Sequence, residues 1–181
     1  MVLGLDISTS CTGWCVIDSS GQLIKMGYVE LLKDKSPFKK AKKVRQALSD
    51  INIDYEIEKI CIEENLQAFR PGFSSAKTLL TLARFNGVVS YLVQEEFCIA
   101  PNFINVNTAR KSLGIKIQKQ SKCGISTKDQ VLSWVSSNVP KNFIWPSKIL
   151  KSGPRKGKTV VQPGCYDMAD SYVIARAGLI N

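Results

Sequence analysis

The sequence predicts an α/β fold in which one mixed sheet of five strands carries helices on both faces. Three strand-like segments open the chain in close succession, which is typical of antiparallel pairing through short turns. Each of the two later strand-like segments follows a helical segment, which is typical of parallel pairing through crossover connections. With 181 residues and 44% apolar composition, the chain can bury one sizeable core, so we expect residues 1–181 to form one domain.

The first three strands are predicted from apolar segments separated by turn residues. Residues 2–6 and 12–17 are mostly apolar, as buried strands are. Residues 18–21 read Asp-Ser-Ser-Gly, which is a turn sequence, and residues 22–30 supply the third strand. The chain is therefore expected to open with an antiparallel meander.

A helix and a fourth strand follow the meander. Pro37 is typical of a first helical turn, and the apolar stripe that includes Val44 and Leu48 predicts a helix to about residue 49. Residues 59–63 read Lys-Ile-Cys-Ile-Glu, which predicts a short buried strand that ends in an acid.

A long helix comes next and is apolar on more than one face. Ser74 or Ser75 is expected to cap its start, and it continues to about Glu96. A helix of this kind is either central to the core or shared with a second subunit.

The last third of the chain is expected to contain one more strand of the sheet, three helices and a hairpin. These are a strand at 103–106, a short helix capped by Asn107 or Thr108, a lysine-rich loop, a helix at 127–137, a hairpin within 141–163 and a closing helix at 166–177.

The formal net charge of +10 favours an anionic partner, with nucleic acid first and an acidic membrane surface second. The alternative is that the charge only serves solubility. The distribution favours nucleic acid, because no acidic residue lies between Asp129 and Asp167 while six basic residues do: Lys141, Lys148, Lys151, Arg155, Lys156 and Lys158.

Composition also excludes several classes of protein. The chain has no histidine, which rules out Ser-His-Asp and Cys-His catalysis. Its six cysteines form no CxxC pair, so they indicate reduced thiols rather than a zinc site. No apolar run approaches the roughly 20 residues that span a bilayer, and the first residues do not resemble a signal peptide. We therefore expect an intracellular, cytoplasmic protein without a membrane partner.

Four acidic residues are candidates for a metal site. Asp6 and Glu63 end the first and fourth strands, and adjacent parallel strands would bring them to the same edge of the sheet. Asp167 and Asp170 share one face at the start of the last helix. Carboxylate oxygens suit Mg²⁺ or Mn²⁺. Alternatively, Asp6 could cap a turn, Asp167 could be a helix N-cap, and Glu63 could mark the point where a strand reaches solvent.

Five segments carry a family resemblance, and they occur in the family's order: Gly4-Leu5-Asp6 with residues 12–17, Ile62-Glu63-Glu64, residues 82–88, residues 127–131, and Asp167-Met168-Ala169-Asp170-Ser171. Together they cover nearly the whole chain and resemble the RuvC family of Holliday junction resolvases. The resemblance implies a ribonuclease H-like fold and a metal-dependent endonuclease that cuts branched DNA. Ile7-Ser8 departs from the family's Pro-Gly, which changes the turn but keeps the acid. The compact, lysine-rich character suits a phage or other viral member, which would work in the host cytoplasm.

The resemblance also implies roles for the acids. Two Mg²⁺ ions, for which Mn²⁺ can substitute, would be held by Asp6 as the bridging ligand, by Glu63, and by Asp167 or Asp170. Lys128 aligns with a family lysine that would stabilise phosphate charge, although a solvated first-turn lysine is the alternative. Paired symmetric nicks in a four-way junction imply a C2 homodimer, which we expect to form through the helix at 75–95.

Other residues are candidates for contact with DNA. The family's aromatic wedge aligns near Leu66, so Phe69 or Phe73 takes that role, next to Arg70. Backbone phosphates are expected to contact a set of basic residues: Lys111 (with Arg110 as an alternative), Lys116, Lys119, Lys122, Lys151, Arg155, Lys156 and Lys158.

Two alternative functions stay open from the sequence. One is an RNA-processing nuclease of the YqgF type, which shares the fold and the acids. The other is a module that binds branched DNA without cutting it. The Gly-Leu-Asp-Ile-Ser-Thr-Ser segment also resembles a phosphate loop of actin-like sugar kinases, but the chain is too short for their two lobes.

Overall fold

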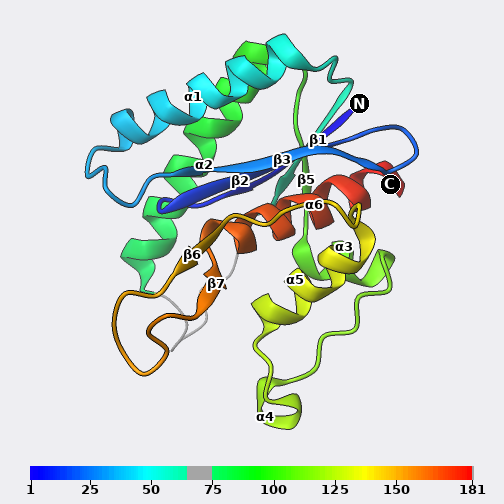
Figure 1. The fold of residues 1–181 in the computed structure, drawn as a ribbon. Coiled ribbons are helices and arrows are strands. Elements are labelled where there is room, and N and C mark those ends of the chain that lie inside the picture. The colour runs from blue at the N-terminus through cyan, green and yellow to red at the C-terminus, as the bar shows by residue number, and fades with distance from the viewer. Residues whose placement is uncertain (65–74, 181) are drawn as a thin grey trace.

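Five strands form one mixed sheet in the order β3-β2-β1-β4-β5 (Figure 1). The structure is a computed structural model that describes residues 1–64 and 75–180. β1 pairs antiparallel with β2, and β2 with β3, whereas β1–β4 and β4–β5 are parallel pairs. The predicted mixed sheet is therefore confirmed. Its strands are β1 (Val2–Ile7), β2 (Cys11–Ile17), β3 (Leu23–Glu30), β4 (Lys59–Glu63) and β5 (Asn102–Ile104).

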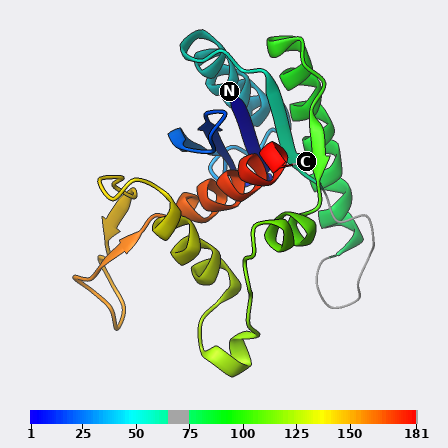
Figure 2. The same ribbon diagram turned by 90° about the vertical axis from the view of Figure 1, so that its right-hand side faces the viewer.

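Helices cover both faces of this sheet (Figures 1 and 2). One face packs against α1 (Pro37–Asp54) and α2 (Ala76–Phe97). The other face packs against α6 (Gly164–Ile180), with α3 (Val106–Ser112) and α5 (Thr127–Asn138) beside it. Because side chains alternate along a strand, Val16 belongs to the first core and its neighbours Cys15 and Ile17 to the second. No helix among the described residues is long and apolar enough to cross a membrane.

Several element boundaries differ from the sequence predictions for local reasons. The cap of α3 is Asn105, whose side chain accepts hydrogen bonds from the backbone of Asn107 and Thr108, so neither of these two residues is the cap. α1 continues to Asp54 because Ile51 is still buried in the core. The segment expected to be a lysine-rich loop contains the short helix α4 (Gln120–Cys123).

Other boundaries agree with the sequence predictions. Ser75 caps α2 by accepting a hydrogen bond from the backbone of Thr78, while Ser74 lies outside the described residues. The hairpin expected within 141–163 is formed by β6 (Ser147–Ile149) and β7 (Thr159–Val161). α6 begins directly after this hairpin.

Two glycines let α6 lie directly against the sheet. A Cβ atom at Gly4 would overlap the Ser171 carbonyl oxygen, at less than 3.0 Å. A Cβ atom at Gly13 would overlap the Asp167 carbonyl oxygen in the same way. Since Gly13 pairs with Asp6 across β1 and β2, this contact brings the start of α6 next to Asp6.

We predict that Gly13→Ala destabilises the protein by about 1–3 kcal/mol or more, because backbone atoms on both sides must separate to admit the methyl group. Gly87→Ala is the matched control, because a Cβ atom there meets no described atom within 4 Å and alanine favours the helix. Thermal unfolding followed by circular dichroism measures both variants. Equal melting temperatures for the two variants would contradict the tight contact.

Candidate metal centre

The fold brings the four predicted acids to one edge of the sheet. Leu5 of β1 is paired with Ile62 of β4, so the next residues, Asp6 and Glu63, lie side by side where the two parallel strands end. The first two turns of α6 bring Asp167 and Asp170 to the same place. Their proximity appears in the electrostatics, because Glu63, Asp170 and Asp167 all act on the Asp6 carboxyl group.

Burial raises the pKa of every one of these acids, and repulsion between them adds to the rise at Asp6, Glu63 and Asp167. Burial raises the pKa of Asp6 well above its usual value, and the charges of the other three acids add to this effect. The pKa of Glu63 rises to about 7, first through burial and then through Asp170, while Arg110 partly opposes the rise. Burial is also the main reason why the pKa values of Asp167 and Asp170 are raised. The positive charge of the described residues is therefore too small to offset the rise in these pKa values.

Neither capping alternative explains the positions of these acids. The turn after β1 is organised by Ser8, whose hydroxyl donates to the Cys11 carbonyl at 2.8 Å and accepts from the Cys11 amide at 3.1 Å. α6 begins at Gly164, so Asp167 lies within the first turn and is not the N-cap residue. Capping therefore accounts for neither carboxyl group, and the side chain of Asp167 is instead hydrogen-bonded to the Cys11 thiol.

Among the described residues, Arg110 on α3 is the basic residue that forms an ion pair with one of the acids, Asp170. Its guanidinium donates a hydrogen bond to Asp170 at 3.0 Å, and the two side chains are only 18% and 15% exposed. Its charge lowers the pKa values of Asp170 and Glu63. The Nε atom of Arg110 is buried without a hydrogen-bond partner. Sequence reasoning named Arg110 only as an alternative to Lys111, because the reach of α3 toward α6 depends on tertiary packing.

Lys128 also lies close enough to act on the acids. Its charge lowers the pKa values of Asp6, Asp167 and Asp170. The side chain is exposed, and its ammonium lies 5.8 Å from the centre of the Tyr166 ring. The charge of Lys128 therefore acts on acids of both a strand and a helix, while its role at a phosphate stays a prediction.

Tyr166 joins α5 to α6 beside Lys128, and sequence reasoning missed it. The Tyr166 hydroxyl donates to the Asp129 carboxylate at 2.8 Å. Asp129 is itself held by Ser126, the N-cap of α5. In the sequence, Tyr166 was marked only by being an aromatic residue directly before Asp167.

The donor set fits a hard divalent cation. Four partly buried carboxylates with raised pKa values supply oxygen ligands, which Mg²⁺ prefers. Within the part of the chain that the structure describes, no three acid or cysteine side chains already enclose an ion-sized space. Part of Asp170 is instead engaged by Arg110. Side-chain rotation would thus be needed to close these ligands around an ion.

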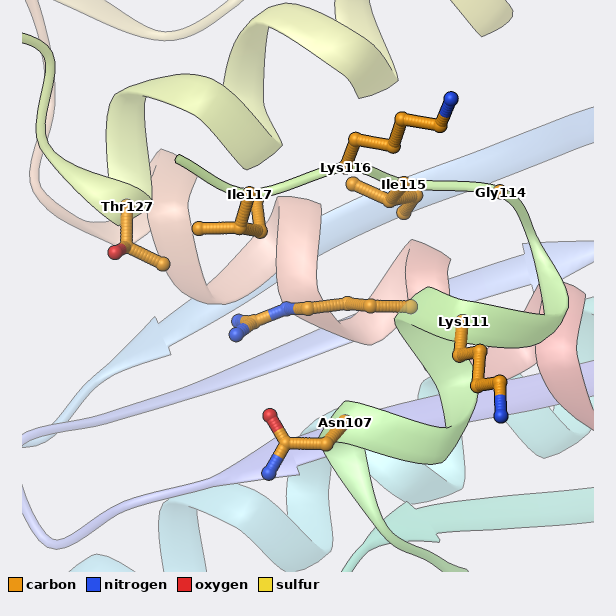
Figure 3. Close-up of a pocket in the computed structure, with 8 residues that line it drawn as sticks. Asn107, Lys111, Gly114, Ile115, Lys116, Ile117 and Thr127 are labelled. Carbon is orange, nitrogen blue, oxygen red and sulfur yellow. The ribbon is translucent and has the colours of Figure 1, made fainter. Parts of the chain in front are cut away.

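The structure describes the remaining basic candidates on three segments of the chain. Lys111 and Lys116 line a pocket of about 540 Å³ together with Asn107, Arg110 and Thr127, and Figure 3 shows both lysine amino groups directed outward. Lys119 and Lys122 are exposed at α4. An exposed group lies between β6 and β7: Lys151, Arg155, Lys156 and Lys158. Phe69, Arg70 and Phe73 lie outside the described residues.

We predict that the metal-free protein becomes less stable as the pH rises from about 5 to 8. The pKa of Glu63 is about 7 in the folded protein, against an ordinary value of 4.5, so the folded state holds more protons. The free energy of unfolding therefore decreases as the pH rises through this window. Glu63→Gln should flatten this dependence. Melting temperatures in chelator across the pH range test it, and an identical decrease in both proteins would contradict it.

Known proteins resemble this chain in sequence and in structure. No family model matches the chain. A 98-residue segment, 53% of the chain, is 28% identical to the crossover junction endodeoxyribonuclease RuvC of Aliarcobacter butzleri. The match covers 60% of that relative, which is less than two thirds of its length.

Solved structures of resolvases match over nearly the whole chain. RuvC of T. thermophilus in complex with a Holliday junction substrate has a TM-score of 0.63 at 15% identity, covering 97% of this chain and 90% of that one. The yeast mitochondrial Holliday junction resolvase Ydc2 has a TM-score of 0.56 at 17% identity, covering 98% and 77%. These comparisons confirm the resemblance to the RuvC family, and the chain has the ribonuclease H-like fold of these resolvases.

Proposed function

We propose that the chain is a structure-selective DNA endonuclease that resolves four-way (Holliday) or other branched junctions by Mg²⁺-dependent hydrolysis. The observation that carries the proposal is the cluster of four partly buried carboxylates at one sheet edge. Two further facts support it: the net charge of +10, and the RuvC relatives, one of which was solved with a Holliday junction.

The four acids are the ligands in this proposal. Two Mg²⁺ ions held there, for which Mn²⁺ can substitute, would activate a water molecule and stabilise the leaving oxygen of the cut strand. Asp6 suits the bridging position because the other three acids all act on it. Glu63 would serve one side, and Asp167 or Asp170 the other. Because the chain has no histidine, no imidazole base competes with this assignment.

The basic residues around the acids would hold the DNA. Lys128 is exposed and acts on three of the acids, so it could stabilise charge on a phosphate at the site. Contacts elsewhere would be independent of base sequence and sensitive to salt. They would come from Lys111, Lys116, Lys119, Lys122, Lys151, Arg155, Lys156 and Lys158. The junction-opening role of Phe69 or Phe73, with Arg70 as a DNA contact beside them, stays a prediction. The phage or viral origin also stays a prediction.

A C2 homodimer would allow paired symmetric nicks, because two copies of one site would then face two strands of a symmetric junction. α2 offers a surface for this pairing. Leu80 and Tyr91 are 59% and 61% exposed, and their spacing of eleven residues places them on one helix face. Exposed apolar side chains on one face of a helix favour an interface.

We predict that Asp6→Asn binds four-way junctions but cuts them at least about 100-fold more slowly, because a ligand oxygen is lost while the fold is kept. Asp54→Asn is the control, since Asp54 is an exposed acid at the end of α1. The assay compares labelled four-way junction, duplex DNA and RNA stem-loop, each with Mg²⁺ and with chelator.

The same assay separates the alternatives. Symmetric nicks in the junction that need Mg²⁺ support the proposal. Preferential cutting of the RNA would favour a YqgF-type nuclease, and junction binding without metal-dependent cutting by the wild type would favour a non-catalytic module. If Asp6→Asn fails to fold, Glu63→Gln provides the second test.

We also predict that Leu80→Asp converts a dimer into monomers, because a charge would be buried in the interface. Ile53→Asp, at an exposed apolar site on α1, is the matched control. Sedimentation equilibrium measures the mass, and the accumulation of singly nicked junctions reports loss of paired cutting. A dimeric Leu80→Asp protein would rule out this face.

A further inference from the structure

A groove opens between α1 and α2, on the opposite face of the sheet from α6. Its volume is about 360 Å³, and its lining includes Thr9, Lys35, Phe38, Lys40, Thr81 and Arg84. We call this the α1–α2 groove. Three of these six residues are basic and none is acidic, so the groove carries positive charge. Among the described residues, none of the DNA-contact candidates named from the sequence belongs to its lining.

The α1–α2 groove lies at the same edge of the sheet as the four acids. Lys40 donates a hydrogen bond to the carbonyl oxygen of Thr9. Thr9 belongs to the loop that joins β1 to β2, three residues after Asp6. A backbone hydrogen bond from Leu31 to Ser10, at 2.9 Å, holds the segment before α1 to the same loop. The groove is therefore attached directly to the turn that follows the first acidic strand.

The side chains of the groove suit a polyanion that also has rings against which an aromatic side chain can stack. No hydrogen bond or ion pair within the described residues engages the charged ends of Lys35 and Arg84, so both are available. Phe38 is 83% exposed, which suits stacking against a base or sugar. The neighbouring acid, Asp34, is already paired with Lys43 at 2.7 Å.

We propose that the α1–α2 groove binds the phosphodiester backbone of a DNA arm next to the strand that is cut. A phosphodiester backbone suits the lining because Lys35, Lys40 and Arg84 are basic and none of the lining residues is acidic. The inference rests on the proposed function, since the acids define the edge at which the DNA lies. The groove would be a further DNA-binding surface on the α1–α2 face of the sheet. The basic residues of α4 and the β6–β7 hairpin lie on the opposite face.

The test variant is Lys35→Ala with Arg84→Ala, which leaves the Lys40 hydrogen bond intact. The control is Lys25→Ala with Arg45→Ala, which removes the same charge from exposed residues that do not line the groove. Fluorescence anisotropy measures binding of a labelled four-way junction in chelator over a series of salt concentrations. Circular dichroism and sedimentation equilibrium check folding and mass.

We expect the groove variant to bind the junction about 10-fold or more weakly than the control at about 0.1 M salt. Its plot of log affinity against log salt should be shallower by about 2, since each phosphate contact contributes about 0.9 to the slope. Affinity and slope equal to those of the control would overturn the proposal. A loss of dimer mass would overturn it too, because the groove would then hold a second copy.

The outcome is distinguishable from failure of the proposed function. If the wild type does not cut any junction in Mg²⁺, the nuclease proposal fails. The salt series needs only binding, so it still decides whether the groove contacts DNA. If the wild type cuts junctions and the groove variant matches the control, only the groove proposal fails.

Discussion

The direct packing of α6 on β1 and β2 is the constraint on which the acidic centre depends. Gly4 and Gly13 remove the side chains that would otherwise separate the helix from the sheet. Without that separation, the carbonyl of Asp167 lies against Gly13, and Gly13 is the cross-strand partner of Asp6. The helix and strand acids are close because their backbones are close. A side chain at either glycine would therefore alter both the core and the acidic centre.

This packing also explains the electrostatic state of the centre. Burial raises all four pKa values, and the neighbouring negative charges raise those of Asp6, Glu63 and Asp167 further. Arg110 and Lys128 offset part of the repulsion from two sides, one on α3 and the other on α5. Arg110 contacts only Asp170 directly, so the charge on Asp6 and Glu63 is compensated less completely. A bound divalent cation would complete the compensation and reduce the need for Arg110.

Much of the fold and the acids could be predicted from the sequence because both leave local signals. Apolar runs marked the strands, and Asp6 and Glu63 ended two of them. Arg110 and Tyr166 had no comparable signal, because each acts through an acid distant in the chain that only helix packing brings near. The two glycines under α6 were equally hidden. Glycine is a weak strand former, and its value there appears only when a helix more than 150 residues later contacts it.

Acids at the centre and bases around it have opposite effects on DNA. Four carboxylates repel a phosphate that approaches the sheet edge, whereas basic residues attract the same strand farther out. The acids are partly buried and confined to one edge, while exposed lysines extend over α4 and the β6–β7 hairpin. With a net charge of +10, attraction prevails at a distance and brings the backbone to the edge. Close to the acids, repulsion prevails until cations neutralise it, so in the proposed nuclease metal binding and correct seating of the phosphate depend on each other.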